Sequence, residues 1–143
     1  MTVFDMVNDL AADWTRKPPA EEQAIQNLLA GCKQDLPTDY LSFLRLCNGG
    51  QGKLSIQPWS FRIWPADELL QANKDYNVQS SIPGFLGFGS SGGGELLAFD
   101  TRTAQPWKVY MIPFIVMQEE DAIEIADSFI AFLEAMGCSK NRA

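Results

Sequence analysis

Apolar side chains recur every three or four residues in the first third of the chain, a spacing that predicts amphipathic helices. Three segments show it, at about residues 3–14, 20–32 and 36–47. The first places Leu10, Ala11 and Trp14 on one stripe and ends before Lys17-Pro18-Pro19, because proline cannot continue a helix. The third ends at Asn48-Gly49-Gly50, since these residues accept the left-handed conformation at a helix C-terminus. We therefore expect three helices before residue 50.

Alternation of apolar and polar side chains follows in the middle of the chain. Trp59, Phe61 and Ile63 are separated by polar residues, which predicts a strand with these three side chains on one face. A helix is expected over about residues 65–77, with an inward face formed by Leu69, Leu70 and Tyr76. Three further strands are expected at about residues 85–89, 95–100 and 108–113, and their short connections favour antiparallel neighbours.

The last segment with helical spacing runs over about residues 119–136. Its expected buried stripe comprises Ala122, Ala126, Phe129, Ile130 and Leu133. Helices near both chain ends then enclose a small antiparallel sheet, which is an α+β architecture. No linker, repeat or low-complexity tract interrupts residues 1–143, so we expect a single domain.

Cysteine content and hydropathy indicate the compartment. Three cysteines are too few, and odd in number, for a secreted disulfide framework. Cys32 and Cys47 lie on apolar stripes and are expected to be buried, whereas Cys138 lies near the C-terminus. The N-terminus lacks the basic start of a signal peptide, and the longest apolar run, residues 111–117, is far shorter than the roughly 20 residues that span a bilayer. These features predict a cytoplasmic protein.

The net charge narrows the class of partner. Acidic residues outnumber basic ones by 18 to 11, which gives a net charge of −7. A surface of this sign repels nucleic acid and anionic membranes, because binding phosphates requires clustered lysine and arginine. It attracts a basic partner, although moderate acidity also serves solubility alone. We therefore expect no direct binding to nucleic acid or membranes.

The composition disfavours catalysis. The chain has no histidine, which removes the usual activators of a nucleophile and the commonest zinc ligand. It also has no Cys-x-x-Cys pair. The run Ser90-Ser91-Gly92-Gly93-Gly94 leads into a strand-like segment without a following lysine, so it predicts a hairpin turn rather than a phosphate-binding loop. We expect no enzymatic activity, no metal and no cofactor.

Acidic and aromatic residues remain as candidates for partner binding. Glu95 and Asp100 are five positions apart on one expected strand, so they point to opposite faces and do not converge on a substrate. Tryptophan is a frequent anchor of protein interfaces, although core packing is its usual role. Acids at a helix N-terminus also have a structural role, because the helix dipole stabilises them. The expected contact residues are Trp59, Trp64, Asp67, Glu68, Glu95, Asp100, Glu119 and Glu120.

Several short motifs occur in an order that resembles the SUKH superfamily, in its yeast cell-wall-regulator-like branch. The opening motif is Leu36-Pro37-Thr38-Asp39-Tyr40 with Asn48-Gly49-Gly50. The segments that resemble its central hairpin are Ile82-Pro83-Gly84-Phe85, Gly92-Gly93-Gly94-Glu95 and Ala98-Phe99-Asp100. Residues 109–114 and 125–133 resemble the next strand and the closing helix. The resemblance covers about residues 20–137 and leaves residues 1–17 outside it.

This resemblance implies an α+β fold and a protein without a known catalytic centre. Many bacterial members of the superfamily are immunity proteins, which bind a cognate toxin, often a nuclease or another nucleic-acid-modifying domain, and block it. Fungal members act in the control of cell-wall synthesis through protein contacts. The resemblance therefore implies an immunity-type protein that neutralises a basic toxin. The alternatives are a regulatory scaffold that binds a host protein, a small-molecule sensor that uses the loops at Asn48 and Gly92, and lastly an enzyme.

Overall fold

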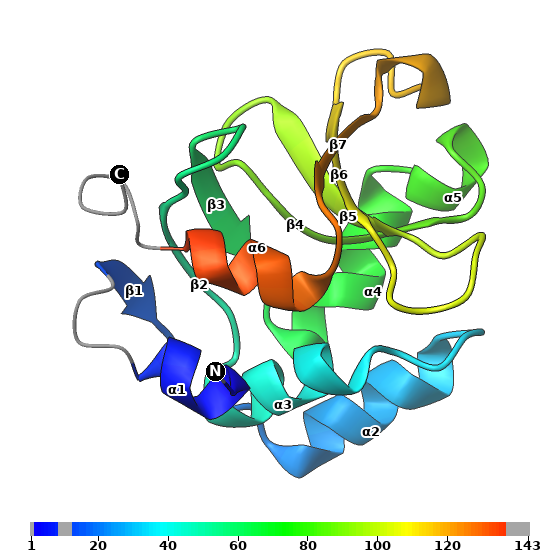
Figure 1. The fold of residues 1–143 in the computed structure, drawn as a ribbon. Helices are drawn as coiled ribbons and strands as arrows, with labels where there is room; N and C mark the ends of the chain where they lie inside the picture. Colours follow the sequence, from blue (N-terminus) through cyan, green and yellow to red (C-terminus); the bar gives the residue numbers. More distant parts are fainter. Residues whose placement is uncertain (1, 9–12, 137–143) are drawn as a thin grey trace.

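The computed structural model describes residues 2–8 and 13–136, in which helices pack on both faces of a sheet (Figure 1). Leu10, Ala11 and Cys138 lie outside the described residues. In chain order the elements are α1 (Val3–Val7), β1 (Trp14–Arg16), α2 (Glu22–Gly31), α3 (Thr38–Leu46), β2 (Gly50–Lys53), β3 (Ser60–Ile63), α4 (Ala66–Asp75), α5 (Val78–Ser81), β4 (Phe85–Ser90), β5 (Glu95–Asp100), β6 (Val109–Pro113), η1 (Glu119–Asp121), β7 (Ile123–Ala126) and α6 (Phe129–Ala135).

The sheet contains seven strands among the described residues, and they lie in chain order from β1 to β7. Every neighbouring pair is antiparallel. The three strands expected after residue 84 are β4, β5 and β6, and the glycine run forms the turn between β4 and β5, with Gly92 at a φ of +83°. The expected α+β fold is therefore confirmed.

Two apolar layers pack on opposite faces of the sheet. Along β5, alternate side chains enter different layers, so that Leu97 and Phe99 join one and Leu96 and Ala98 join the other. The larger layer also receives buried side chains from α1, α2, α3 and α6. Its centre is a cluster of buried rings: Tyr40, Phe43, Phe88, Phe99, Phe129 and Phe132. The smaller layer lies beneath α4 and α5 and includes Trp64, Phe85 and Ile112.

The expected helix over residues 3–14 is correct only for α1. Trp14 instead begins edge strand β1 and pairs with Gly52 of β2. Its ring can lie flat on β2 because that strand lacks side chains there: a Cβ on Gly50 or Gly52 would fall 2.6 or 2.5 Å from Trp14 atoms. Both strands are short, and β2 contains two glycines, so neither shows the alternation that identifies a strand in sequence.

The expected helix over residues 119–136 is also wrong in its first half. Residues 123–126 form β7, which pairs with β6 at the sheet edge, and Lys108 Nζ lies 3.3 Å from Glu124 Oε1 across this pair. The helix begins only after Ser128, whose hydroxyl accepts a backbone N–H of the first turn at 3.1 Å. Ala122 and Ala126, expected on the helical stripe, lie outside any helix and are half-buried.

A buried asparagine fastens α4 to the centre of the sheet. Strand β4 has an irregular register between Gly87 and Gly89, and Asn73 pairs with the backbone at this point. Its Nδ2 donates to Gly87 O at 2.8 Å and its Oδ1 accepts the Gly87 N–H at 2.9 Å. Asn73 is 3% exposed, and its amide also bonds Leu69 O and Gln79 Nε2. This contact fixes the position of α4 along β4 and its rotation about its own axis, and so determines which side of the helix faces outward.

Candidate partner-binding surface

The start of α4 is set by Asn48, which follows α3. Asn48 Oδ1 accepts the Ala66 N–H at 2.7 Å, and Asn48 Nδ2 donates to Asp67 Oδ1 at 3.2 Å. Gly49 next to it has a φ of +94°, and a Cβ there would lie 2.4 Å from Ile63 O. The Asn-Gly motif therefore joins the end of α3 to the start of α4 and holds Asp67 in place.

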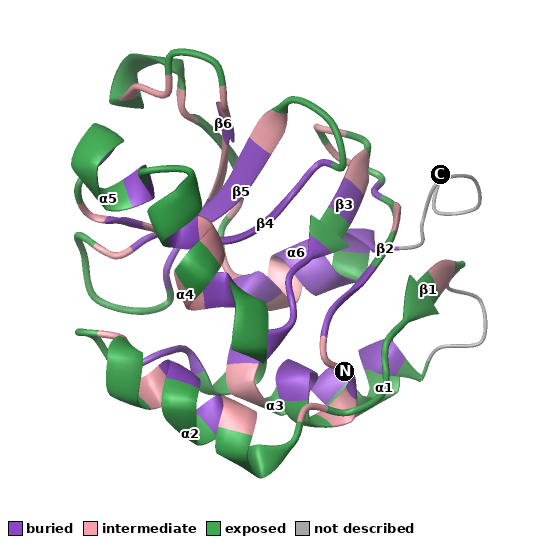
Figure 2. Cartoon of the chain, turned by 180° about the vertical axis from the view of Figure 1, so that it is seen from behind, coloured by how far each residue is buried: buried purple, intermediate pink, exposed green. Residues whose placement is uncertain are grey.

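A hollow of about 630 Å³ lies along the outward side of α4, which is exposed in Figure 2. Its lining residues are Trp64, Asp67, Glu68, Gln71, Ala72, Asp75 and Tyr76. Three of these seven are carboxylates and none is basic, so the hollow favours a positively charged group. Sequence reasoning identified Trp64, Asp67 and Glu68, and the structure brings these three together.

An aromatic stack forms one wall of this hollow. The Trp64 ring stacks on Tyr76 with centroids 6.0 Å apart, and Tyr76 stacks on Phe114 at 4.4 Å. Trp64 itself is only 8% exposed, so it packs beneath Tyr76 and has little surface available for a partner. Tyr76, expected to face inward, follows the last residue of α4 and is instead 47% exposed, with its ring stacked on Phe114.

Sequence reasoning did not identify Tyr76, Phe114, Ile115 and Val116 as surface residues. Ile115 and Val116 are strongly exposed and follow Phe114 directly. The available signal was the apolar run of residues 111–117, which continues beyond Pro113 where strand β6 ends. Phe114 and Met117 of this segment pack against the smaller apolar layer, whereas Ile115 and Val116 between them face the solvent.

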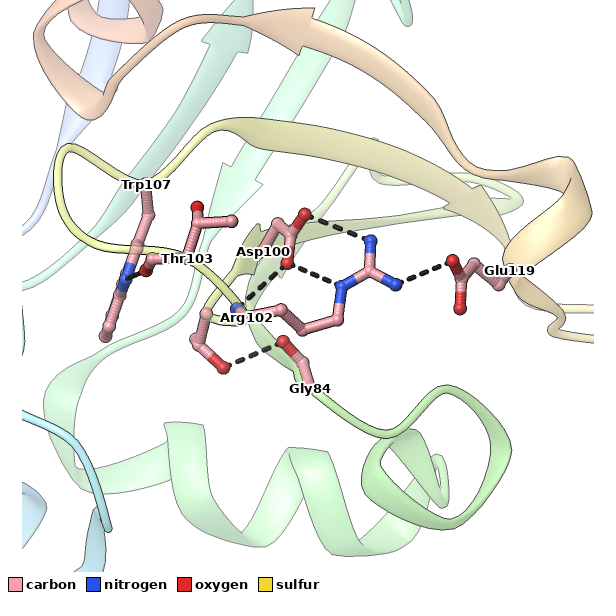
Figure 3. Close-up of polar contacts among 7 residues, drawn as sticks. Gly84, Asp100, Arg102, Thr103, Trp107 and Glu119 are labelled. Carbon is pink, nitrogen blue, oxygen red and sulfur yellow. Dashed lines mark hydrogen bonds and ion pairs between the residues drawn. The ribbon is translucent and has the colours of Figure 1, made fainter.

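Arg102 links two of the expected contact residues, Asp100 and Glu119 (Figure 3). Its Nε and Nη2 donate to the two Asp100 carboxylate oxygens at 2.9 and 3.1 Å, and its Nη1 donates to Glu119 Oε2 at 2.6 Å. The guanidinium also lies 4.8 Å from the Phe85 ring centroid. Gly84 makes room for the Arg102 stem, since a Cβ there would approach it to 2.5 Å. Asp100 is 8% exposed, so its carboxylate binds Arg102 rather than a partner protein.

This arrangement has a consequence for acid stability. The hydrogen bonds from Arg102 lower the pKa of Asp100, outweighing the opposite effect of burial. A carboxyl whose pKa is lower in the folded state stabilises the protein above its unfolded-state pKa, and this contribution disappears as the pH falls through the folded-state pKa. We expect Arg102→Gln to reduce the free energy of unfolding by about 1 kcal/mol at pH 7, because the pair is partly exposed. The difference from wild type should shrink below about pH 4.

Urea unfolding of both proteins between pH 7 and pH 3 measures this difference. Arg45→Gln is a suitable control, because Arg45 pairs with Glu22 on the exposed surface at 3.2 Å and should contribute less. A difference between wild type and Arg102→Gln that is independent of pH would contradict the assigned role of Asp100.

The remaining expected residues lie apart from the hollow. Trp59 is 59% exposed with a φ of +73° and precedes β3, so it does not share the inward face of Phe61 and Ile63. Glu95, at the start of β5, accepts a hydrogen bond from Ser91 Oγ at 2.7 Å. Glu120 lies exposed on η1, in the loop that begins with Phe114.

Negative charge is concentrated on this side of the molecule. Helix α4 and residues 114–121, together with Asp100 and Arg102, contain seven acidic residues and two basic ones. Their net charge of −5 is most of the −7 carried by the whole chain. We call this region the acidic face.

Two further features of the described part of the chain bear on the site. Within residues 2–8 and 13–136, no group of three or more potential ligands is placed to hold a metal ion. No helix in the same ranges has the length and apolar character needed to cross a membrane.

Comparison with known proteins identifies the family. The model of the SMI1 / KNR4 family (SUKH-1) matches residues 19–135, close to the range of about 20–137 expected from the motifs. A search of curated proteins gives no match.

Proposed function

The chain belongs to the SMI1 / KNR4 family (SUKH-1), and from this premise we propose that it is an immunity-type protein, which neutralises a cognate bacterial toxin by direct binding. The partner is a basic protein domain, with a nuclease or another nucleic-acid-modifying toxin as the best fit. Such enzymes hold phosphates with clustered lysine and arginine, and an acidic inhibitor competes for the same groups.

The observation that supports this proposal is the distribution of charge. The acidic face carries five of the seven net negative charges and includes the hollow beside α4. Charge gathered on one side orients an approaching basic protein, whereas the same charge spread evenly would only increase solubility. Glu68 and Asp75 are the residues to substitute, because both line the hollow and both are exposed, whereas Asp67 accepts a hydrogen bond from Asn48.

A pair of charge-reversal variants tests the proposal against a toxin domain that co-purifies with the tagged chain from its native cell. The double variant Glu68→Lys/Asp75→Lys should associate with it about ten- to a hundredfold more slowly at low salt, because steering is lost. Added salt should slow the wild type and narrow this difference. Stopped-flow or surface-plasmon association rates provide the measurement, and survival of cells that express the toxin domain provides the biological one.

A control variant shows whether the location of the substituted charges matters or only the change in net charge. Asp13→Lys/Asp35→Lys makes the same change in total charge at exposed residues outside the acidic face. It should retain most of the wild-type association rate. Equal slowing by both double variants would show that the acidic face has no special role, and a toxin domain that neither binds nor is inhibited would refute the proposal.

A further inference from the structure

Two aliphatic side chains project from the acidic face. Ile115 and Val116 are 84% and 72% exposed, the highest values among the described large apolar residues. They form the turn directly after Phe114, whose ring stacks on Tyr76 at the wall of the hollow. We call these two residues the apolar tip. Both side chains remain in water in the free protein, although burial normally stabilises aliphatic side chains of this size.

The backbone at the apolar tip is unfavourable as well. Val116 has a φ of +51°, in the left-handed region, where a β-branched residue is a rare exception. Glycine or asparagine would adopt this conformation more readily. Folding of the free chain would therefore be served better by a small polar residue at this position. Exposed strain of this kind points to a role in binding.

The surroundings of the apolar tip indicate what covers it. The tip precedes the acidic run of residues 119–121. It also follows Phe114, whose ring stacks on Tyr76 in a hollow lined by three carboxylates. A second copy of this chain would bring a like-charged face against this one, which is unfavourable. A protein that is basic around an apolar depression matches both the charge and the exposed aliphatic groups.

We propose that Ile115 and Val116 insert into an apolar depression on the basic partner and determine how slowly the complex dissociates. This inference rests on the proposed function and assigns the association and dissociation of the complex to different residues. The carboxylates steer the partner and set the association rate, and the apolar tip holds it after contact. Interfaces commonly depend on a few central residues that become fully desolvated on binding, and changes at such residues act mainly on the dissociation rate.

The test uses the full chain and the same toxin domain. Ile115→Ser and Val116→Asn each remove an aliphatic group, and asparagine tolerates the positive φ, so folding should be preserved. We expect each variant to raise the dissociation rate about tenfold or more and to change the association rate less than about twofold. Phe4→Ser is the control, because Phe4 is 61% exposed on α1 and lies outside the acidic face.

Four outcomes are distinguishable. Dissociation that is faster for both tip variants and unchanged for Phe4→Ser supports the inference. Wild-type binding with an unchanged dissociation rate in both tip variants overturns it and leaves the proposed function intact, whereas a wild type that does not bind refutes both. Analytical ultracentrifugation of the chain alone tests whether the tip binds a second copy of this chain. A dimer in the wild type that becomes a monomer in Ile115→Ser would show that it does, and this outcome also overturns the inference.

Discussion

Replacing Phe88 with alanine is expected to lower the free energy of unfolding by about 3–5 kcal/mol, the usual cost of emptying a fully buried aromatic site. Phe88 is 0% exposed and lies at the centre of the larger apolar layer. Its ring centroid is 4.5 Å from Phe99, 5.5 Å from Phe132 and 5.9 Å from Phe129. The substitution therefore removes contacts with the sheet and with α6 together. Because domains of this kind are stable by only about 5–15 kcal/mol, this loss is a large fraction of the total free energy of unfolding.

Urea or thermal unfolding followed by tryptophan fluorescence measures this loss. Phe4→Ala is the matched control, since it deletes the same ring from an exposed position and should change stability by less than about 0.5 kcal/mol. Similar effects of the two substitutions would mean that Phe88 is not the centre of the core.

The second large effect is expected at Asn73, on the opposite face of the sheet. Asn73→Leu keeps a similar size but leaves the Gly87 N–H and C=O without partners in a buried position. Each unpaired buried group costs about 1–3 kcal/mol, so a loss of about 3 kcal/mol is expected. Asn73→Asp should also be destabilising, because a carboxylate oxygen would replace the amide that donates to Gly87 O and Leu69 O.

Asn27→Leu provides the comparison for this prediction. Asn27 is exposed on α2, so the same change should cost less than about 0.5 kcal/mol. Asn73→Leu should also weaken binding to the partner, because α4, which forms part of the acidic face, would lose a contact that sets its position. A stable Asn73→Leu variant that binds normally would show that the packing of α4 on the sheet suffices without this amide.

The residues of the candidate site before and at the start of α4 could be predicted from the sequence, whereas those after β5 could be predicted only in part. Trp64, Asp67 and Glu68 follow one another at the end of β3 and the start of α4, and their neighbourhood is local in the chain. Charge identifies Glu119 and Glu120, but their position on η1 depends on the β6–β7 connection, where the sequence pattern predicts a helix instead. The Arg102 pairs with Asp100 and Glu119 could not be assigned, because a salt bridge across a loop leaves no periodic pattern.

By itself the sequence determined the α+β class, helix α3, and strands β4, β5 and β6. These elements are long enough for periodicity to show, and the Asn-Gly and triple-glycine turns mark their ends. It also placed the acids Asp67 and Glu68 at the start of the helix after β3. All of these are properties of neighbouring residues.

Only the tertiary structure determined which segments form the outer strands of the sheet and which residues lie together on the surface. Strands β1, β2 and β7 are defined by their partners rather than by their own pattern, since backbone pairing depends little on side-chain alternation in segments of three or four residues. The stack of Trp64, Tyr76 and Phe114 joins residues up to 50 positions apart. Contacts over such separations arise from packing, which local sequence does not record, and they place Phe114, which precedes the exposed Ile115 and Val116, against Tyr76 at the end of α4.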